Sequence, residues 1–268
     1  MLTESERHIV ICNWNAGGDR VVRELHSSDA EPDTEIVVAT DKELNEEELR
    51  KNPAYGNVYF VRGDPTLHYV LQAARVAAAK SIIILADEES PGADARSALI
   101  ALAITRLCGT AKPHIVAQAF NHRLVQHLQD AGADEIVCAA DYGLGLLAQC
   151  ALHAKLSAVY DDLLSYAEGS NEIYIVEGAR FPKCLIGKSF DEAAEILNRN
   201  RTWENPVILL GMRRGDKFLL NPRRDRRTAP GERFDRIEEG DALLVMAYQM
   251  PDLSGLCVPC EAGATATG

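Results

Sequence analysis

The fold predicted for this chain is decided by residues 8–25, HIVICNWNAGGDRVVREL. An apolar run of strand length leads into a glycine-containing turn, and apolar residues then recur at helical spacing. This order is typical of the opening unit of a nucleotide-binding α/β domain, in which phosphates lie at the start of the helix. The three positions of the dinucleotide glycine motif read Asn13, Asn15 and Gly18, so only the last is glycine.

Further apolar runs of strand length continue the pattern, and helical segments separate them. The expected strands cover residues 8–12, 35–41, 57–62, 80–87, 114–120 and 135–138. Strands that alternate with helices indicate a right-handed, doubly wound parallel sheet. We therefore expect a Rossmann-like α/β lobe over residues 1–140.

The pattern changes after this lobe. Residues 141–167 predict one long helix whose apolar face lasts about seven turns, within a crossover region of residues 141–170. That apolar surface exceeds what one sheet face needs, which indicates contact with another domain or subunit. Short strands and one helix then predict a smaller α+β C-terminal lobe over residues 171–250. Residues 251–268 are predicted to form a disordered tail.

Composition excludes several classes of protein. The formal net charge of -12 disfavours general binding to nucleic acids or to anionic membranes, because both surfaces would repel the chain. No apolar run reaches the roughly 18 residues of a membrane span. The polar start, residues 1–7, shows no signal peptide.

The seven cysteines are odd in number, and five of them lie inside apolar runs. This distribution predicts buried free thiols and a reducing cytoplasm. Cys257 and Cys260 form a C-x-x-C pair near the end of the chain. No second Cys or His pair accompanies it, so we interpret it as tail composition in preference to a metal or redox site.

Several motifs in this order resemble the RCK (regulator of K⁺ conductance) family, also called KTN or Trk-type domains. The resemblance covers roughly residues 7–250 and rests on Val10-Ile11-Cys12-Asn13-Trp14-Asn15, Gly63-Asp64-Pro65-Thr66, residues 130–137, Ile186-Gly187-Lys188-Ser189, Asn221-Pro222 and Glu239-Gly240-Asp241. It implies a non-enzymatic regulator that pairs as a homodimer through the crossover helix. It further implies an octameric ring beneath the pore domain of a potassium channel, on the cytoplasmic face of the membrane, which the ring meets only through the pore.

The loop of residues 13–18 predicts a small-molecule nucleotide ligand, either NAD(H) or an adenine nucleotide. Asparagine tolerates positive φ, so the turn can form, and its amide adds donors for a phosphate. The other interpretation is an empty structural loop, with Trp14 packed over the sheet edge. The candidate binding residues are Asn13, Trp14, Asn15, Ala16, Gly17, Gly18, Asp41, Asp64, Pro65, Thr66 and Asp87.

Carboxylates follow several strands at the edge where open α/β sheets bind ligands. Asp41 is placed either to bond ribose hydroxyls or to cap the next helix. Asp87 and Glu88 are the candidates for a divalent cation such as Ca²⁺, with solvated helix caps as the alternative. Gln118 and Phe120 stand where calcium-activated family members carry glutamates, so only Asp87 matches that calcium site.

Arginines gather in the second lobe and suit either anion binding or pairing with acidic neighbours. They are Arg213, Arg214, Arg223, Arg224, Arg226 and Arg227. Two other functions remain as alternatives to the channel regulator. One is a stand-alone regulatory subunit of a Trk/Ktr-type potassium transporter, and the other is an NAD(P)-dependent oxidoreductase, for which the second lobe shows no catalytic pattern.

Overall fold

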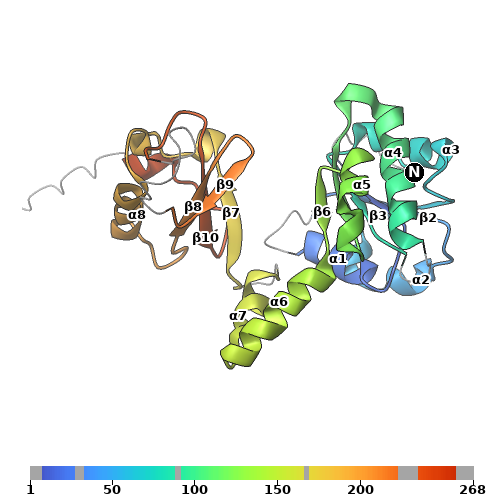
Figure 1. Cartoon of the computed structure of the whole chain (residues 1–268), viewed down its shortest axis with the longest axis horizontal. Coiled ribbons are helices and arrows are strands. Elements are labelled where there is room, and N and C mark those ends of the chain that lie inside the picture. Colours follow the sequence, from blue (N-terminus) through green and yellow to red (C-terminus); the bar gives the residue numbers. More distant parts are fainter. Residues whose placement is uncertain (1–7, 28–32, 88–91, 166–168, 223–234, 258–268) are drawn as a thin grey trace, which may run out of the picture. The chain divides into compact units, whose positions relative to one another are not determined.

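The computed structural model describes residues 8–27, 33–87, 92–165, 169–222 and 235–257 (Figure 1). The chain divides into two compact units, Met1–Val159 with Tyr166–Glu168, and Tyr160–Ser165 with Gly169–Gly268. Among the helices of the described ranges, none combines the length and the apolar content that crossing a bilayer requires.

The first unit is built on a six-stranded parallel sheet with the order β3-β2-β1-β4-β5-β6. Its strands are β1 (Ile9–Cys12), β2 (Ile36–Thr40), β3 (Val58–Arg62), β4 (Ser81–Ile84), β5 (His114–Gln118) and β6 (Glu135–Val137). The chain starts at the centre, runs outward to β3, and returns to place β4 on the other side of β1. This order confirms the predicted doubly wound sheet and puts its switch point between β1 and β4.

Helices cover both faces of this sheet (Figure 1). The α-helices are α1 (Gly18–Leu25), α2 (Glu46–Leu49), α3 (His68–Ala73), α4 (Ala93–Cys108) and α5 (Val125–Asp130), and the 3₁₀ turns are η1 (Pro53–Tyr55), η2 (Val76–Ala78), η3 (Gly109–Ala111) and η4 (His122–Leu124). Side chains alternate along β1, so Val10 and Cys12 join one buried cluster while Ile9 and Ile11 join another. Burial raises the pKa of the Cys12 thiol to about 12, which makes it an unreactive core residue.

The crossover region differs from the prediction of a single helix. It contains α6 (Ala139–Leu152) and α7 (Leu156–Leu163), separated by residues 153–155. Lys155 adopts a left-handed conformation with φ 71°, which an α-helix cannot contain. Apolar periodicity continues across this break, and periodicity alone therefore suggested one helix where the backbone makes two.

The second unit contains an antiparallel sheet with the order β7-β10-β8-β9. Its elements are β7 (Glu172–Val176), η5 (Gly178–Arg180), η6 (Lys183–Leu185), α8 (Phe190–Arg199), β8 (Ile208–Arg214), β9 (Lys217–Leu220), β10 (Ala242–Ala247) and η7 (Ser254–Cys257). Helix α8 begins with a capping box in which Ser189 and Glu192 bond each other's backbone N–H groups. This confirms the predicted small α+β lobe.

Two predictions about the second unit need correction. Residues 251–257 were expected to belong to a disordered tail, but Leu253 is buried and Leu256 packs on the core of the second unit. Residues 258–268 of the predicted tail lie outside the described residues. Cys184 was expected to be a free thiol, and it is disulfide-bonded. Apolar neighbours suit buried half-cystines as well as thiols, so composition could not separate the two.

Candidate functional site at the carboxyl edge of the parallel sheet

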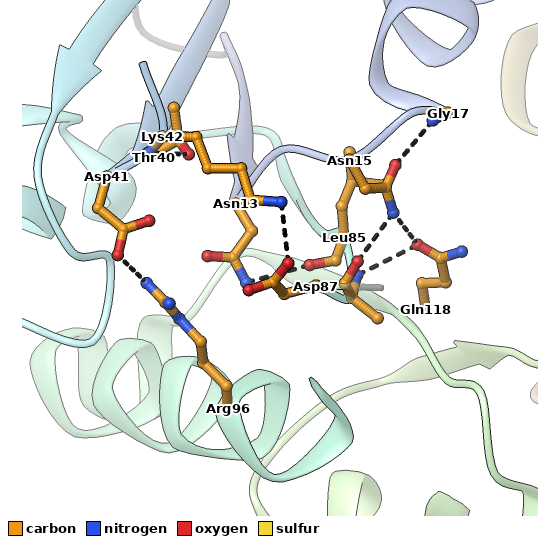
Figure 2. A network of polar contacts seen from close by, with 11 residues as sticks. Asn13, Asn15, Gly17, Thr40, Asp41, Lys42, Leu85, Asp87, Arg96 and Gln118 are labelled. Carbon is orange, nitrogen blue, oxygen red and sulfur yellow. Dashed lines mark hydrogen bonds and ion pairs between the residues drawn. The ribbon is translucent and has the colours of Figure 1, made fainter. Parts of the chain in front are cut away.

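The strand ends of the first unit bring four of the predicted site residues to one edge of the sheet, and Figure 2 shows three of them, Asn13, Asp41 and Asp87. Asn13 directly follows β1, and Asp41 directly follows β2. Asp64 lies two residues beyond β3, and Asp87 three residues beyond β4. Because all these strands are parallel, their carboxyl ends lie at the same edge, which brings together side chains that are far apart in sequence.

The two asparagines of the turn bond neighbouring strands. Asn13 has φ 66°, which confirms that asparagine supplies the left-handed turn, and its Nδ2 donates to the Leu85 carbonyl at 3.1 Å. Asn15 donates to the Ala86 carbonyl and to Gln118 Oε1, both at 2.9 Å (Figure 2). Both amide hydrogens of Asn15 are therefore used within the protein. The two side-chain amides, which we considered as donors to a phosphate, instead hold the turn against the ends of β4 and β5.

The same turn is closed from its other side by Asn15 Oδ1, which accepts the Gly17 N–H at 2.9 Å. Ala16 and Gly17 themselves are exposed. The turn therefore presents its backbone to solvent at the start of α1, and its side chains point into the sheet edge.

Trp14 is a core residue. It is 9% exposed and packs with Ile11, Val22 and Ile36 in the cluster beside α1. A Cβ atom on Gly18 would lie 2.7 Å from the indole, so the last glycine of the motif makes room for Trp14. This agrees with the interpretation of Trp14 as an aromatic packed at the sheet edge.

Arg96, which the sequence analysis did not select, bonds two of the three described carboxylates at this edge. Arg96 in α4 donates to Asp41 Oδ2 at 2.6 Å and to Asp64 Oδ1 at 3.2 Å. Burial opposes the charge on both Arg96 and Asp64. The bonds and charge of the carboxylates nevertheless raise the Arg96 pKa, and the hydrogen bonds from Thr66 together with the Arg96 charge lower the Asp64 pKa.

Asp64 also organises the turn after β3. Its Oδ1 accepts the Thr66 N–H at 2.9 Å, and Pro65 between them is buried. Gly63 has φ 152°, and a Cβ there would meet Val70 at 2.6 Å. The motif Gly63-Asp64-Pro65-Thr66 thus forms the tight connection that the sequence predicts, with its carboxylate directed to Arg96.

Asp87 faces a cation. Lys42 Nζ lies 2.9 Å from Asp87 Oδ1 (Figure 2). Glu88, the second candidate metal ligand, lies outside the described residues. In the described part of the chain, no group of three or more His, Cys, Asp or Glu side chains is placed to hold a metal ion. The described carboxylates of this edge are paired with Arg96 and Lys42.

Three residues of this network were absent from our list of site residues: Lys42, Arg96 and, as a bonding partner, Gln118. Gln118 Oε1 accepts from Asn15 and also from the Ala86 N–H at 3.1 Å. The sequence carried one usable signal, since Arg96 is a cation in the first turns of α4, a helix made mainly of Ala, Leu and Ile. Buried Asp94 of α4 has another function, because it accepts the N–H groups of Phe120 and Asn121 at 2.9 Å.

Two arginines of the predicted cluster pair with acids. Arg213 bonds Glu177. Arg214 makes a two-pronged contact with buried Asp241, at 2.8 and 2.7 Å, and also bonds Glu238. Pairing with acidic neighbours is therefore correct for these two arginines, while Arg223, Arg224, Arg226 and Arg227 lie outside the described residues.

Comparison with known proteins identifies the first unit. Residues 4–130 match the family model described as the calcium-activated potassium channel slowpoke-like RCK domain. The matched residues are slightly fewer than half of the chain, and they are similar in sequence to an RCK domain. The match begins before β1 and ends with α5, so the matched range contains every strand end of the site described above.

Curated relatives of this chain are named as channels. The chain is 26% identical over 196 residues to the calcium-gated potassium channel TvoK of Thermoplasma volcanium, covering 71% of this chain and 53% of the relative. It is 28% identical over 255 residues to the probable ion channel POLLUX of Oryza sativa, covering 90% of this chain and 24% of the relative. The chain thus spans about half the length of the first relative and about a quarter of the second.

The RCK fold extends into the second unit. The human SLO3 gating ring matches with a TM-score of 0.65 at 18% identity, over 91% of this chain and 44% of that chain. At this identity the likeness shows the fold alone. It confirms the Rossmann-like sheet followed by a smaller lobe.

Proposed function

We propose that this chain is a ring-forming regulatory module that controls the gating of a potassium-conducting pore. The RCK match and the relatives named as channels support a channel over a transporter subunit or an oxidoreductase. The pore belongs to the same polypeptide or to a partner, and the module lies on the cytoplasmic face of the membrane. Ligand binding that favours one shape of the ring shifts the gating equilibrium toward that shape.

The observation that carries this proposal is that helix α6 exposes its apolar side chains to solvent. No residue of α6 is buried, although the helix contains Tyr142, Leu144, Leu147 and Leu152 with exposed side chains. Exposed apolar surface of this extent marks a contact between proteins. A second copy of α6 would bury it in a two-fold homodimer, as proposed for the crossover region.

A ring of eight domains needs a second contact, because one two-fold interface closes after a dimer. Helices α4 and α5 pack against each other and offer it (Figure 1). Leu99 and Leu102 of α4 are exposed, and with Ala98, Leu124 and neighbouring residues they line an apolar hollow of about 400 Å³. Two separate apolar surfaces on one unit support assembly beyond the dimer.

Charged substitutions on these two surfaces test the assembly. We expect the full chain to form a ring, Leu147→Asp and Leu99→Asp each to stop assembly at the dimer, and the double variant to remain monomeric. Each substitution buries a charge at its contact and should weaken that contact by about 100-fold. Light scattering after size exclusion, together with native mass spectrometry, measures the species present.

Tyr69→Asp provides the matched control, since Tyr69 is an exposed aromatic residue on α3 that lines neither surface. This variant should assemble like the parent. A parent chain that stays monomeric at all concentrations would overturn the proposed ring. Full assembly of the double variant would show that neither of the two surfaces forms a contact in the ring.

We propose a nucleotide, NAD(H) or an adenine nucleotide, as the ligand of the carboxyl edge. The exposed backbone of Ala16 and Gly17 at the start of α1 suits phosphates. Asp41 at the end of β2 is 41% exposed and suits ribose hydroxyls. Arg96 currently bonds Asp41, so a bound ribose takes the place of Arg96, whose guanidinium is then available to a phosphate.

Calorimetric titration with NAD⁺, NADH, ADP and ATP tests this ligand. We expect Asp41→Asn to weaken binding by roughly 10- to 100-fold, because a hydrogen bond to a charged acceptor is lost. Glu43→Gln, which removes an exposed carboxylate two residues away, should leave affinity unchanged. Equal affinities for Asp41→Asn and the parent would exclude this pose. The same titration with Ca²⁺ tests the pair Asp87 and Glu88.

A further inference from the structure

A cavity of about 210 Å³ lies within the second unit, beside the carboxyl end of α8. Its walls come from that helix end, from the loop of residues 200–207 that follows it, and from residues 251–256. Sites for drug-sized ligands have volumes of roughly 300–1,000 Å³, so this cavity suits a smaller molecule.

One part of the cavity is aliphatic. Leu197 and Leu253 are buried members of the core cluster of the second unit, and Val207 and Leu256 pack against that cluster. An aliphatic group placed against these side chains leaves water and displaces no polar contact of the protein.

Asn205 fixes the wall that the loop provides. Its Nδ2 donates to the Gln249 carbonyl at 2.9 Å, and its Oδ1 accepts the N–H groups of Tyr248 and Gln249 at 3.1 and 3.2 Å. Thr202 Oγ1 donates to the Asn205 carbonyl at 3.2 Å and closes the loop on itself. The loop is thus held against the end of β10 before any ligand binds, which reduces the entropy that binding would otherwise lose.

Two charged residues of opposite sign also line the cavity, Arg201 and Asp252, and both are exposed. Within the described ranges, the Arg201 side chain forms no hydrogen bond and no ion pair. Asp252 Oδ1 accepts the Ser254 N–H at 3.0 Å, and a carboxylate can accept further bonds. The hydrogen bonds from Ser254 and the charge of Arg180 lower the Asp252 pKa, so this carboxyl group is ionised at neutral pH.

We propose that this cavity binds a free α-amino acid with an aliphatic side chain, such as leucine. The ligand carboxylate bonds Arg201, its ammonium group bonds Asp252, and its side chain lies against the aliphatic wall. A fatty acid or an alkylamine would use only one of the two charges. The inference does not rest on the nucleotide or on the assembly of a ring.

Calorimetric titration of the full chain with L-leucine tests the ligand class. We expect a Kd of about 0.1 mM, which is within reach of a ligand of this size. The analogues 4-methylpentanoate, which lacks the ammonium group, and 3-methylbutylamine, which lacks the carboxylate, should each bind at least about 10-fold more weakly. No binding of leucine up to about 10 mM would overturn the proposal, and so would an analogue that binds as tightly as leucine.

Two substitutions test the assigned contacts. Arg201→Gln and Asp252→Asn each remove one charge from an exposed side chain, and each should weaken leucine binding by about 10-fold or more. Arg199→Gln is the matched control, because Arg199 pairs with Glu195 and does not line the cavity. Circular dichroism checks that the variants are folded. Parent affinity in both cavity variants, or an equal loss in the control, would contradict the two contacts.

Hydrogen exchange of the full chain locates the bound leucine. We expect slower exchange at the N–H groups of Asn205 and Leu253, which bond on the two sides of the cavity. Because leucine binds only the folded second unit, a concentration of about 100 times Kd should raise the Tm of that unit by roughly 10 °C. Leucine binding that protects only N–H groups outside residues 197–207 and 248–256 would place the site elsewhere and refute the inference.

Discussion

We expect Gly18→Ala to lower the free energy of unfolding of the first unit by about 2–3 kcal/mol, because the substitution forces an atom into a filled core. The added Cβ would lie 2.7–2.8 Å from three atoms of the Trp14 indole. The indole is rigid and packs between α1 and the sheet, so the helix must shift away from the strands. Urea denaturation measures the change.

Tryptophan fluorescence reports this transition directly, because Trp14 is buried and the second tryptophan, Trp203, is fully exposed. Gly17→Ala is the control, since its Cβ would come no closer than 3.3 Å to Asn15 Oδ1. Trp14→Leu removes the obstacle, so we expect Gly18→Ala to be nearly neutral in that background when circular dichroism follows unfolding. Equal costs in both backgrounds would mean that the indole does not require this glycine.

Arg214→Met is expected to destabilise the second unit by about 3 kcal/mol. The side chain of Asp241 is 2% exposed and receives two hydrogen bonds from Arg214. Without the guanidinium, the buried carboxylate keeps the Glu238 N–H as a donor and loses its neighbouring positive charge. Burying a charge without its partner is costly, because water can no longer solvate it.

Arg213→Met is the matched control, as Arg213 pairs with the exposed carboxylate of Glu177. Exposed ion pairs contribute at most about 1 kcal/mol, so this variant should unfold close to the parent. Hydrogen exchange at β8 and β10 localises the effect. Similar losses of stability for the two variants would show that the burial of Asp241 does not determine the effect of removing Arg214.

The spacing of apolar residues along the sequence was sufficient to predict the layers of the fold. Alternating apolar runs and helical segments predicted the six-stranded parallel sheet and the small second lobe, and both are present. Periodicity failed where the backbone turns without changing composition. The break at Lys155 between α6 and α7 is one such place, and the packed turn η7 in the expected tail is another.

At the candidate site, the sequence was sufficient to predict where the carboxylates lie, but only the tertiary structure shows which residues they bond. Asp41, Asp64 and Asp87 were assigned to strand ends because each follows an apolar run, which is a local property. Arg96 is 32 residues beyond Asp64 in sequence and meets it only because α4 returns over the edge of the sheet. Long-range ion pairs leave no periodic signal, so the sequence did not predict that Arg96 bonds Asp41 and Asp64.

The sequence by itself therefore determined the doubly wound sheet and the left-handed turn at Asn13, because each follows from local patterning or local backbone geometry. Only the tertiary structure decided what Asn13 and Asn15 bond. Their amides donate to carbonyls more than 70 residues away, at the end of a strand that β1 meets through parallel pairing. Side chains choose their partners by proximity in space, and the folded sheet creates that proximity.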